Sequence, residues 1–158
     1  MPYDARTVAN YFLELADHDH IPVGPLKLQK LVYLAHGWHL VFFGRPLIKN
    51  DVEAWRYGPV VPALYREFKE FGASPITRRA RGFDTDTLDE DAKRLIDAVW
   101  NKYKMLSAAQ LSAITHERNS AWDMTLRNSS PFDRLTIVDA LIADEFQRRR
   151  QADGRAAY

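Results

Sequence analysis

The sequence contains no cysteine, which excludes disulfides, thiolate nucleophiles, iron–sulfur clusters and cysteine-based zinc sites. It has only seven glycines, which are spread as turn residues and form no phosphate-binding loop. No stretch approaches the ~18 apolar residues of a membrane span, and the first residues lack the basic and then apolar run of a signal peptide. We therefore expect a soluble cytoplasmic protein with no cofactor and no membrane partner.

The net charge is also close to zero, because the chain has 22 basic and 21 acidic residues. Such a balance supplies no long-range field that would attract DNA, RNA or an anionic membrane. The length of 158 residues predicts one domain, and a chain of this size buries enough surface for an ordinary core. We place this domain at residues 1–150 and expect residues 151–158 to form a disordered C-terminal tail.

Apolar side chains recur along the chain at the spacing of helical faces. This periodicity predicts a mainly α, compact single domain of about six to seven helices with a small β-hairpin-like element. Asp4, Ser107 with Gln110, and Ser120 have the form of helix N-caps. The predicted helices cover about residues 5–16, 26–43, 89–104, 107–115 and 120–126, with one more from Gly58-Pro59 to near 71 and a last one ending near 150.

The helix at 26–43 is apolar almost all round, a pattern typical of a central helix. Gly37 stands in its middle, where glycine costs about 1 kcal/mol relative to alanine. We therefore expect a large ring or another backbone to pass close to Gly37. Trp38 and Trp100 continue apolar helical faces and are predicted to be buried.

The alternation of side chains before Gly58-Pro59 predicts a short strand with Glu53 and Trp55 on one face. Gly58-Pro59 itself has the form of a helix start, because proline suits the first helical turn. If the strand crosses the central helix, Glu53 would form a partly buried ion pair with Lys30 or Lys27.

Histidine and carboxylate side chains are the groups that remain for metal binding or catalysis. Asp17, His18 and His20 stand close together in a polar loop, and His116 follows a predicted helix. A small metal-dependent hydrolase that uses these residues is therefore one alternative function. Ligands adjacent in sequence seldom close a metal site by themselves, so we favour a solvated loop, a structural His116, and no metal or catalytic residue.

Two arginine clusters raise another alternative, a DNA-binding regulator of its own operon. Arg78, Arg79 and Arg81 lie in one loop, and residues 148–150 are all arginine. Short runs of like charge are typical of a solvated face, and no helix-turn-helix pattern carries a basic recognition helix. We therefore expect no nucleic-acid partner.

The most specific pattern is a series of blocks from Leu26 to Tyr65. The blocks are Leu-Lys-Leu-Gln-Lys-Leu-Val-Tyr at 26–33, Gly-Trp at 37–38, Gly-Arg-Pro-Leu at 44–47 and Glu-Ala-Trp-Arg-Tyr-Gly-Pro-Val at 53–60. This pattern closely resembles the Panacea domain of SocA-like antitoxins, a family that includes many phage- and prophage-associated proteins. A looser likeness, through His116 and Trp122, extends over about residues 5–147.

The resemblance implies a non-enzymatic protein that neutralises a cognate toxin, encoded beside it, by direct binding. In SocA-like members it also implies an adaptor that delivers the toxin to a Clp-type protease. Members of the family are paired with toxins of different kinds. The resemblance therefore implies a general binding scaffold in which one region varies and determines which toxin is bound.

Aromatic and arginine side chains dominate the energetics of interfaces, and this indicates where a toxin would bind. The predicted partner-binding residues flank the Gly58-Pro59 turn or lie where the resemblance is weakest: Arg56, Tyr57, Gly58, Pro59, Tyr65, Arg78, Arg79 and Arg81. The other motif residues are expected to be structural: Lys27, Lys30, Trp38, Glu53, Trp55, His116 and Trp122.

Overall fold

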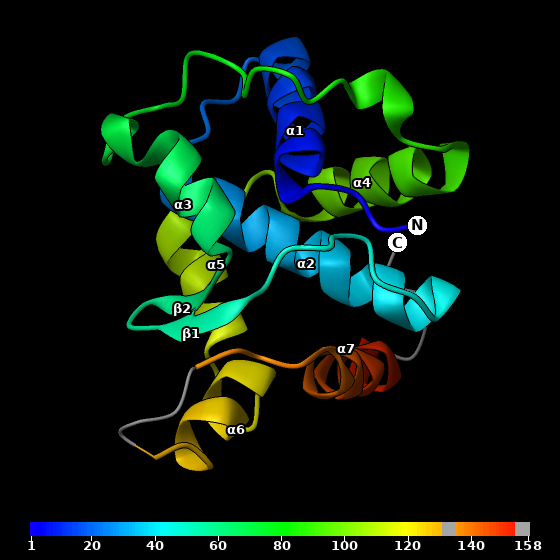
Figure 1. Ribbon diagram of the computed structural model, residues 1–158, viewed down its shortest axis with the longest axis vertical. Helices are drawn as coiled ribbons and strands as arrows, with labels where there is room; N and C mark the ends of the chain where they lie inside the picture. The colour runs from blue at the N-terminus through cyan, green and yellow to red at the C-terminus, as the bar shows by residue number, and fades with distance from the viewer. Residues whose placement is uncertain (131–134, 154–158) are drawn as a thin grey trace.

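The computed structural model describes residues 1–130 and 135–153 of the chain (Figure 1). These residues form seven α-helices and one two-stranded antiparallel hairpin, which confirms the predicted mainly α fold with a small β element. The elements are α1 (Ala5–Asp19), α2 (Pro25–Phe43), β1 (Glu53–Trp55), β2 (Gly58–Val60), α3 (Pro62–Phe68), the 3-10 turns η1 (Lys69–Phe71) and η2 (Thr85–Thr87), α4 (Glu90–Tyr103), α5 (Ala108–Thr115), α6 (Ala121–Arg127) and α7 (Asp139–Asp153).

Helix α2 occupies the middle of the molecule and packs against α1, α3, α4, α5, α7 and β2. All of its residues from Lys27 to His39 are buried, as its nearly continuous apolar surface predicts. Figure 1 shows α1, α3 and α4 on one side of α2, and α6 and α7 on the other. Although α2 is long and apolar, no helix in the described part of the chain has the length and apolarity to cross a membrane.

Local signals fix three of the helix starts as predicted. The Asp4 side chain accepts a hydrogen bond from the Arg6 N–H (2.9 Å) at the start of α1. Ser107 and Gln110 form the reciprocal capping box of α5, and Ser120 caps α6. Each cap satisfies backbone N–H groups that the first helical turn leaves without a partner.

Two helices extend further than the sequence predicts. Helix α1 continues to Asp19, because His20 adopts the left-handed conformation (φ 56°) and ends the helix there. Helix α7 continues to Asp153, where the carboxylate pairs with Lys102 of α4 at 3.2 Å. The rest of the predicted tail, residues 154–158, lies outside the described residues.

The hairpin differs from the prediction at Gly58-Pro59, which begins β2 instead of a helix. Gly58 has a φ of +112°, which a helix does not accommodate, and it pairs with Trp55 of β1. Pro59 pairs with Ala54, and α3 begins only at Pro62.

The other edge of β1 is covered by residues 135–137. The Ala54 N–H donates to the Leu135 carbonyl (2.8 Å), and the Ile137 N–H donates to the Val52 carbonyl (2.7 Å). Strand β1 therefore has a partner on both sides.

Residues 72–89, which carry the predicted arginine cluster, cross α1 as an extended arm (Figure 1). The side chain of Asn10 on α1 holds this arm through three hydrogen bonds. Its Nδ2 donates to the carbonyls of Ala80 (3.0 Å) and Phe83 (2.9 Å), and its Oδ1 accepts from the Ala80 N–H (2.9 Å). The arm is therefore fixed to the surface of the domain.

A phenyl ring passes over Gly37, as the sequence predicts. A Cβ atom at this position would lie 2.4 Å from Cδ1 of Phe146 on α7. Phe146 is fully buried and packs edge-on against Tyr33 and Trp38 of α2, with ring centroids 5.7 and 5.1 Å apart. The absence of a side chain at Gly37 therefore allows α2 and α7 to pack closely.

The substitution Gly37→Ala is expected to destabilise the protein, although alanine favours a helix by about 1 kcal/mol. The methyl group would displace the Phe146 ring in a closed core, and such overpacking costs about 1–3 kcal/mol. Chemical denaturation measures the change. The same substitution should cost less in a Phe146→Leu background, and equal costs in both backgrounds would contradict the contact.

Candidate functional site

The tip of the hairpin and the adjoining turn of α3 expose aromatic side chains. Tyr57 is 59% exposed and Tyr65 is 46% exposed. Trp55 is half-buried, and its ring packs edge-on against Tyr65 with centroids 5.1 Å apart. Arg56 is exposed, and its guanidinium carbon lies 5.3 Å from the centre of the Tyr57 ring. We call Trp55, Arg56, Tyr57 and Tyr65 the hairpin face.

The backbone under the hairpin face is held by side chains from three helices. Each of them donates a hydrogen bond to an alternate backbone carbonyl of the hairpin. The bonds run from Trp122 Nε1 of α6 to Trp55 O (2.6 Å), from Ser112 Oγ of α5 to Tyr57 O (2.5 Å) and from Lys30 Nζ of α2 to Pro59 O (2.8 Å). The exposed rings are therefore preorganised by a fixed backbone.

Gln29 of α2 holds the backbone at Val61, two residues after Pro59, in the same way. Its Oε1 accepts from the Val61 N–H (2.9 Å), and its Nε2 donates to the Val61 carbonyl (3.1 Å). The bonded residues 57, 59 and 61 alternate along the outer edge of β2 and its two flanking residues, and Pro59 has no N–H to offer. Side chains thus take the places that a neighbouring strand would occupy, and the edge is closed.

Gly58 and Pro59, which were predicted to contact a partner, are buried in β2. A Cβ atom on Gly58 would lie 3.1 Å from Lys30 Nζ and 3.3 Å from Thr115 Oγ1. The positive φ of Gly58 also disfavours any residue that carries a side chain at this position. The two residues therefore shape and anchor the loop, and the exposed side chains of the loop are those of Arg56 and Tyr57.

The predicted ion pair of Glu53 is wrong. Glu53 Oε1 accepts a hydrogen bond from Trp55 Nε1 (2.9 Å), and Lys27 Nζ donates to the Lys104 carbonyl at the end of α4 (2.6 Å). The reason is the order of the strands, since β2 is the strand that packs against α2 and brings the Pro59 carbonyl to Lys30. Lys30 therefore meets a backbone carbonyl of β2, and Glu53 forms no ion pair within the described residues.

Lys30 is fully buried, and no carboxylate among the described residues pairs with its ammonium. Burial lowers the pKa of Lys30 to about 8, because desolvation disfavours the charged form. The carbonyl of Pro59 is its hydrogen-bond acceptor. The position of the hairpin and the protonation of this lysine are therefore coupled.

The hairpin precedes α3, and the arm with its arginines follows the other end of α3. Two of these arginines form ion pairs within the chain. Arg78 forms ion pairs with Glu67 (2.9 Å) and Glu70 (2.7 Å). Arg79 pairs with Asp17 of α1. Arg81 is exposed. The structure thus separates these arginines from the hairpin face and gives Arg78 and Arg79 a role in holding the arm.

The residues of the metal alternative do not come together. Asp17 pairs with Arg79, and His20 ends α1. His116 follows α5, where its ring lies 5.2 Å from that of Trp122. Within residues 1–130 and 135–153, no three His, Asp or Glu side chains form a group that could hold a metal ion.

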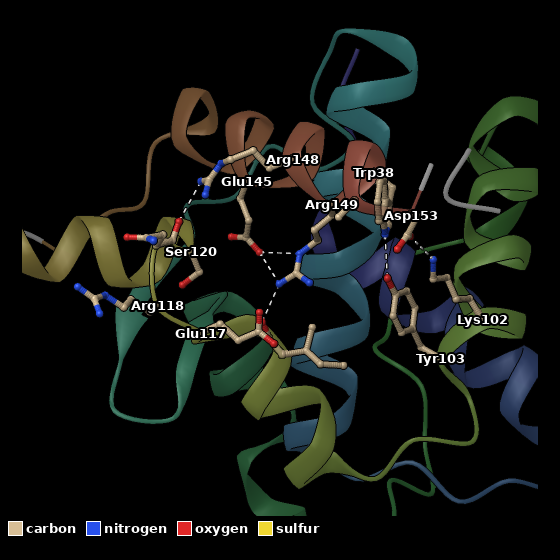
Figure 2. A pocket seen from close by; sticks show the side chains of 13 residues that line it. Trp38, Lys102, Tyr103, Glu117, Arg118, Ser120, Glu145, Arg148, Arg149 and Asp153 are labelled. Carbon is tan, nitrogen blue, oxygen red and sulfur yellow. Dashed lines mark hydrogen bonds and ion pairs between the residues drawn. The ribbon is translucent and has the colours of Figure 1, made fainter. Parts of the chain in front are cut away.

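A recess of about 420 Å³ lies between α7, the end of α4 and the turn from α5 to α6 (Figure 2). Figure 2 shows Glu145 and Arg149 pointing toward one another inside it, while Arg148 extends toward the α5–α6 turn. Arg148 Nη2 donates to the Asn119 carbonyl (2.9 Å), and Arg149 Nη2 donates to the Ile114 carbonyl (2.6 Å). These side chains are therefore engaged within the molecule.

Glu145 is the centre of this network and is 4% exposed. Its Oε1 accepts from the Tyr33 hydroxyl (3.0 Å) and the Ala121 N–H (2.9 Å), and its Oε2 accepts from Arg149 Nε (2.9 Å). The network joins α2, α5, α6 and α7, so we assign it a structural role. Sequence reasoning did not identify it, although Glu145 stands four residues before Arg149, a spacing that brings side chains together on a helix.

Raising the pH should stabilise the protein through Lys30. Its pKa is about 8 in the folded protein against an ordinary value of 10.5, so between these values the unfolded chain binds more protons and stability rises with pH. Relative to Lys30→Met, the wild type should gain about 2 kcal/mol between pH ~7.5 and pH ~9.5. Urea denaturation at both pH values measures this, and a constant difference would contradict a buried ammonium.

Replacing Glu145 by alanine should strongly destabilise the protein. The change leaves the partly buried Arg149 without its counter-charge, and the Tyr33 hydroxyl and Ala121 N–H without an acceptor. Removing one partner of such a pair costs about 3 kcal/mol or more, which thermal and urea denaturation would detect. The adjacent exposed Asp144→Ala is the matched control and should change stability by less than about 0.5 kcal/mol. Equal losses in the two variants would disprove the role of the network.

Comparison with known proteins identifies a family and a relative of this chain. The profile of the family described as "Antitoxin SocA-like, Panacea domain" matches residues 28–123, from α2 to α6, and so includes the hairpin and its three supporting helices. The protein named "Antitoxin SocA" from Caulobacter vibrioides (strain NA1000 / CB15N) is 38% identical over 156 residues, covering 91% of this chain and 82% of the relative. No solved structure matches the chain. The chain therefore belongs to the family of SocA-like antitoxins with a Panacea domain.

Proposed function

We propose that this protein neutralises a cognate toxin by stoichiometric protein–protein binding, with the hairpin face as the contact surface. Family membership supports an antitoxin role. The observation that carries the binding mechanism is the exposure of Tyr57 and Tyr65 on a backbone fixed from beneath. Large amphipathic rings and arginine are the side chains that contribute most at interfaces.

Preorganisation strengthens this assignment. A loop that becomes ordered only on binding loses part of its interaction energy to conformational entropy. Here Lys30, Ser112 and Trp122 hold the loop before any partner arrives. The aromatic rings therefore need little reordering when a toxin binds.

Binding at this surface would act either by covering the active site of the toxin or by holding the toxin in an inactive conformation. Both mechanisms need a stable complex, and neither needs a catalytic group in the antitoxin. This agrees with a non-enzymatic role, which the family also favours.

The resemblance also implies that the protein delivers the toxin to a Clp-type protease. This role requires a second binding surface. An adaptor has to hold toxin and protease at the same time. The recess between α4, α7 and the α5–α6 turn shares no residue with the hairpin face. We therefore propose this recess as the surface that would contact the protease.

Co-expression with the adjacent reading frame tests the proposal. We expect that frame to be toxic alone, growth to be restored by this protein, and the two chains to purify as a stoichiometric complex. Repeating the assay without the Clp protease separates the two mechanisms, because binding alone still protects the cells whereas delivery does not. Persistent toxicity with this protein in excess would disprove the antitoxin function.

A further inference from the structure

The hairpin face combines the guanidinium of Arg56 with exposed aromatic rings. Arg56 is exposed, and no carboxylate in the described part of the chain pairs with its guanidinium. Arg78, Arg79 and Arg149, by contrast, each form an ion pair inside the molecule. The charge of Arg56 is therefore left for an external group.

The arrangement of Arg56 suits a carboxylate in particular. Its guanidinium lies over the Tyr57 ring, with the central carbon 5.3 Å from the ring centre, which orients the planar group before binding. A guanidinium presents parallel N–H donors that match the two oxygens of a carboxylate. The nearby carboxylate of Glu53 is engaged by Trp55 Nε1 at 2.9 Å.

The rings of the hairpin face cannot withdraw into the protein. The carbonyls of Trp55 and Tyr57 are hydrogen-bonded to Trp122 and Ser112, so the loop has no freedom to fold inward without breaking these bonds. Tyr57 remains 59% exposed at the tip. An apolar depression on a partner would remove this surface from water, while the tyrosine hydroxyl could stay at the rim.

We propose that the hairpin face recognises a toxin surface on which a carboxylate lies beside an apolar depression. Arg56 pairs with the carboxylate, and the Tyr57 ring fills the depression with Tyr65 at its edge. This inference rests on the proposed function, because it takes the toxin to be the partner. It adds the chemistry of the toxin surface and assigns specificity to two neighbouring residues of the loop.

Binding measurements on full-length protein and the toxin of the adjacent reading frame test the inference. Tyr57→Ala should weaken the complex by about 30-fold or more, as for a central interface residue, and Tyr57→Phe should stay close to wild type. Arg56→Gln should weaken it by about 10-fold and reduce its sensitivity to salt between ~0.05 and ~0.3 M, because a charge pair is lost. Arg56→Glu should weaken it further.

Arg94→Gln is the matched control, since Arg94 is exposed on α4, a helix that contributes nothing to the hairpin face. It should leave the affinity unchanged, and an effect as large as that of Arg56→Gln would overturn the inference in favour of a general effect of net charge. Normal affinity of the Arg56 and Tyr57 variants would also overturn it while leaving the antitoxin function intact. If the wild-type chain does not bind the toxin, the proposed function fails and the inference fails with it. A dimer in light scattering that Tyr57→Ala dissociates would identify a second copy as the occupant and overturn the inference.

Discussion

The buried ammonium of Lys30 and its hydrogen bond to the Pro59 carbonyl join the central helix to the loop that displays Tyr57. A cation in an apolar interior costs free energy unless a polar partner stays in place, so the loop cannot shift without raising that cost. Gly58 makes room for the ammonium, and Gln29 holds the next residues of the chain. A polar interaction inside an apolar helix thus determines where a surface loop lies.

The parts of the fold that the sequence predicted are those that depend on neighbours along the chain. The N-caps at Asp4 and Ser107 and the buried central helix need only local patterns. The ring over Gly37 was predictable because a glycine inside a helix needs a packing reason. The pair between Glu53 and Lys30 was not, since alternation along a strand shows which side chains share a face but not which strand of a hairpin lies against a helix.

For the candidate site, sequence reasoning found the exposed tyrosines but not what supports them. Ser112 becomes a hydrogen-bond donor to the hairpin only when the fold brings α5 beneath it. In the arm, sequence reasoning predicted a binding residue that the fold uses internally. Arg78 is an arginine, a type common at interfaces, but it pairs with Glu67 and Glu70 of its own chain. Arg56 differs from Arg78 in its exposure and in having no carboxylate partner among the described residues, and both are properties of the folded chain.

The closed edge of β2 has a consequence for the behaviour of the protein at high concentration. An open strand beside exposed rings would pair with other extended chains, including copies of itself. Side chains instead donate to the outward carbonyls of residues 57, 59 and 61, and residues 135–137 cover the other side of β1. The hairpin therefore offers side chains to a partner, and these bonds disfavour pairing of its backbone with the strands of another copy.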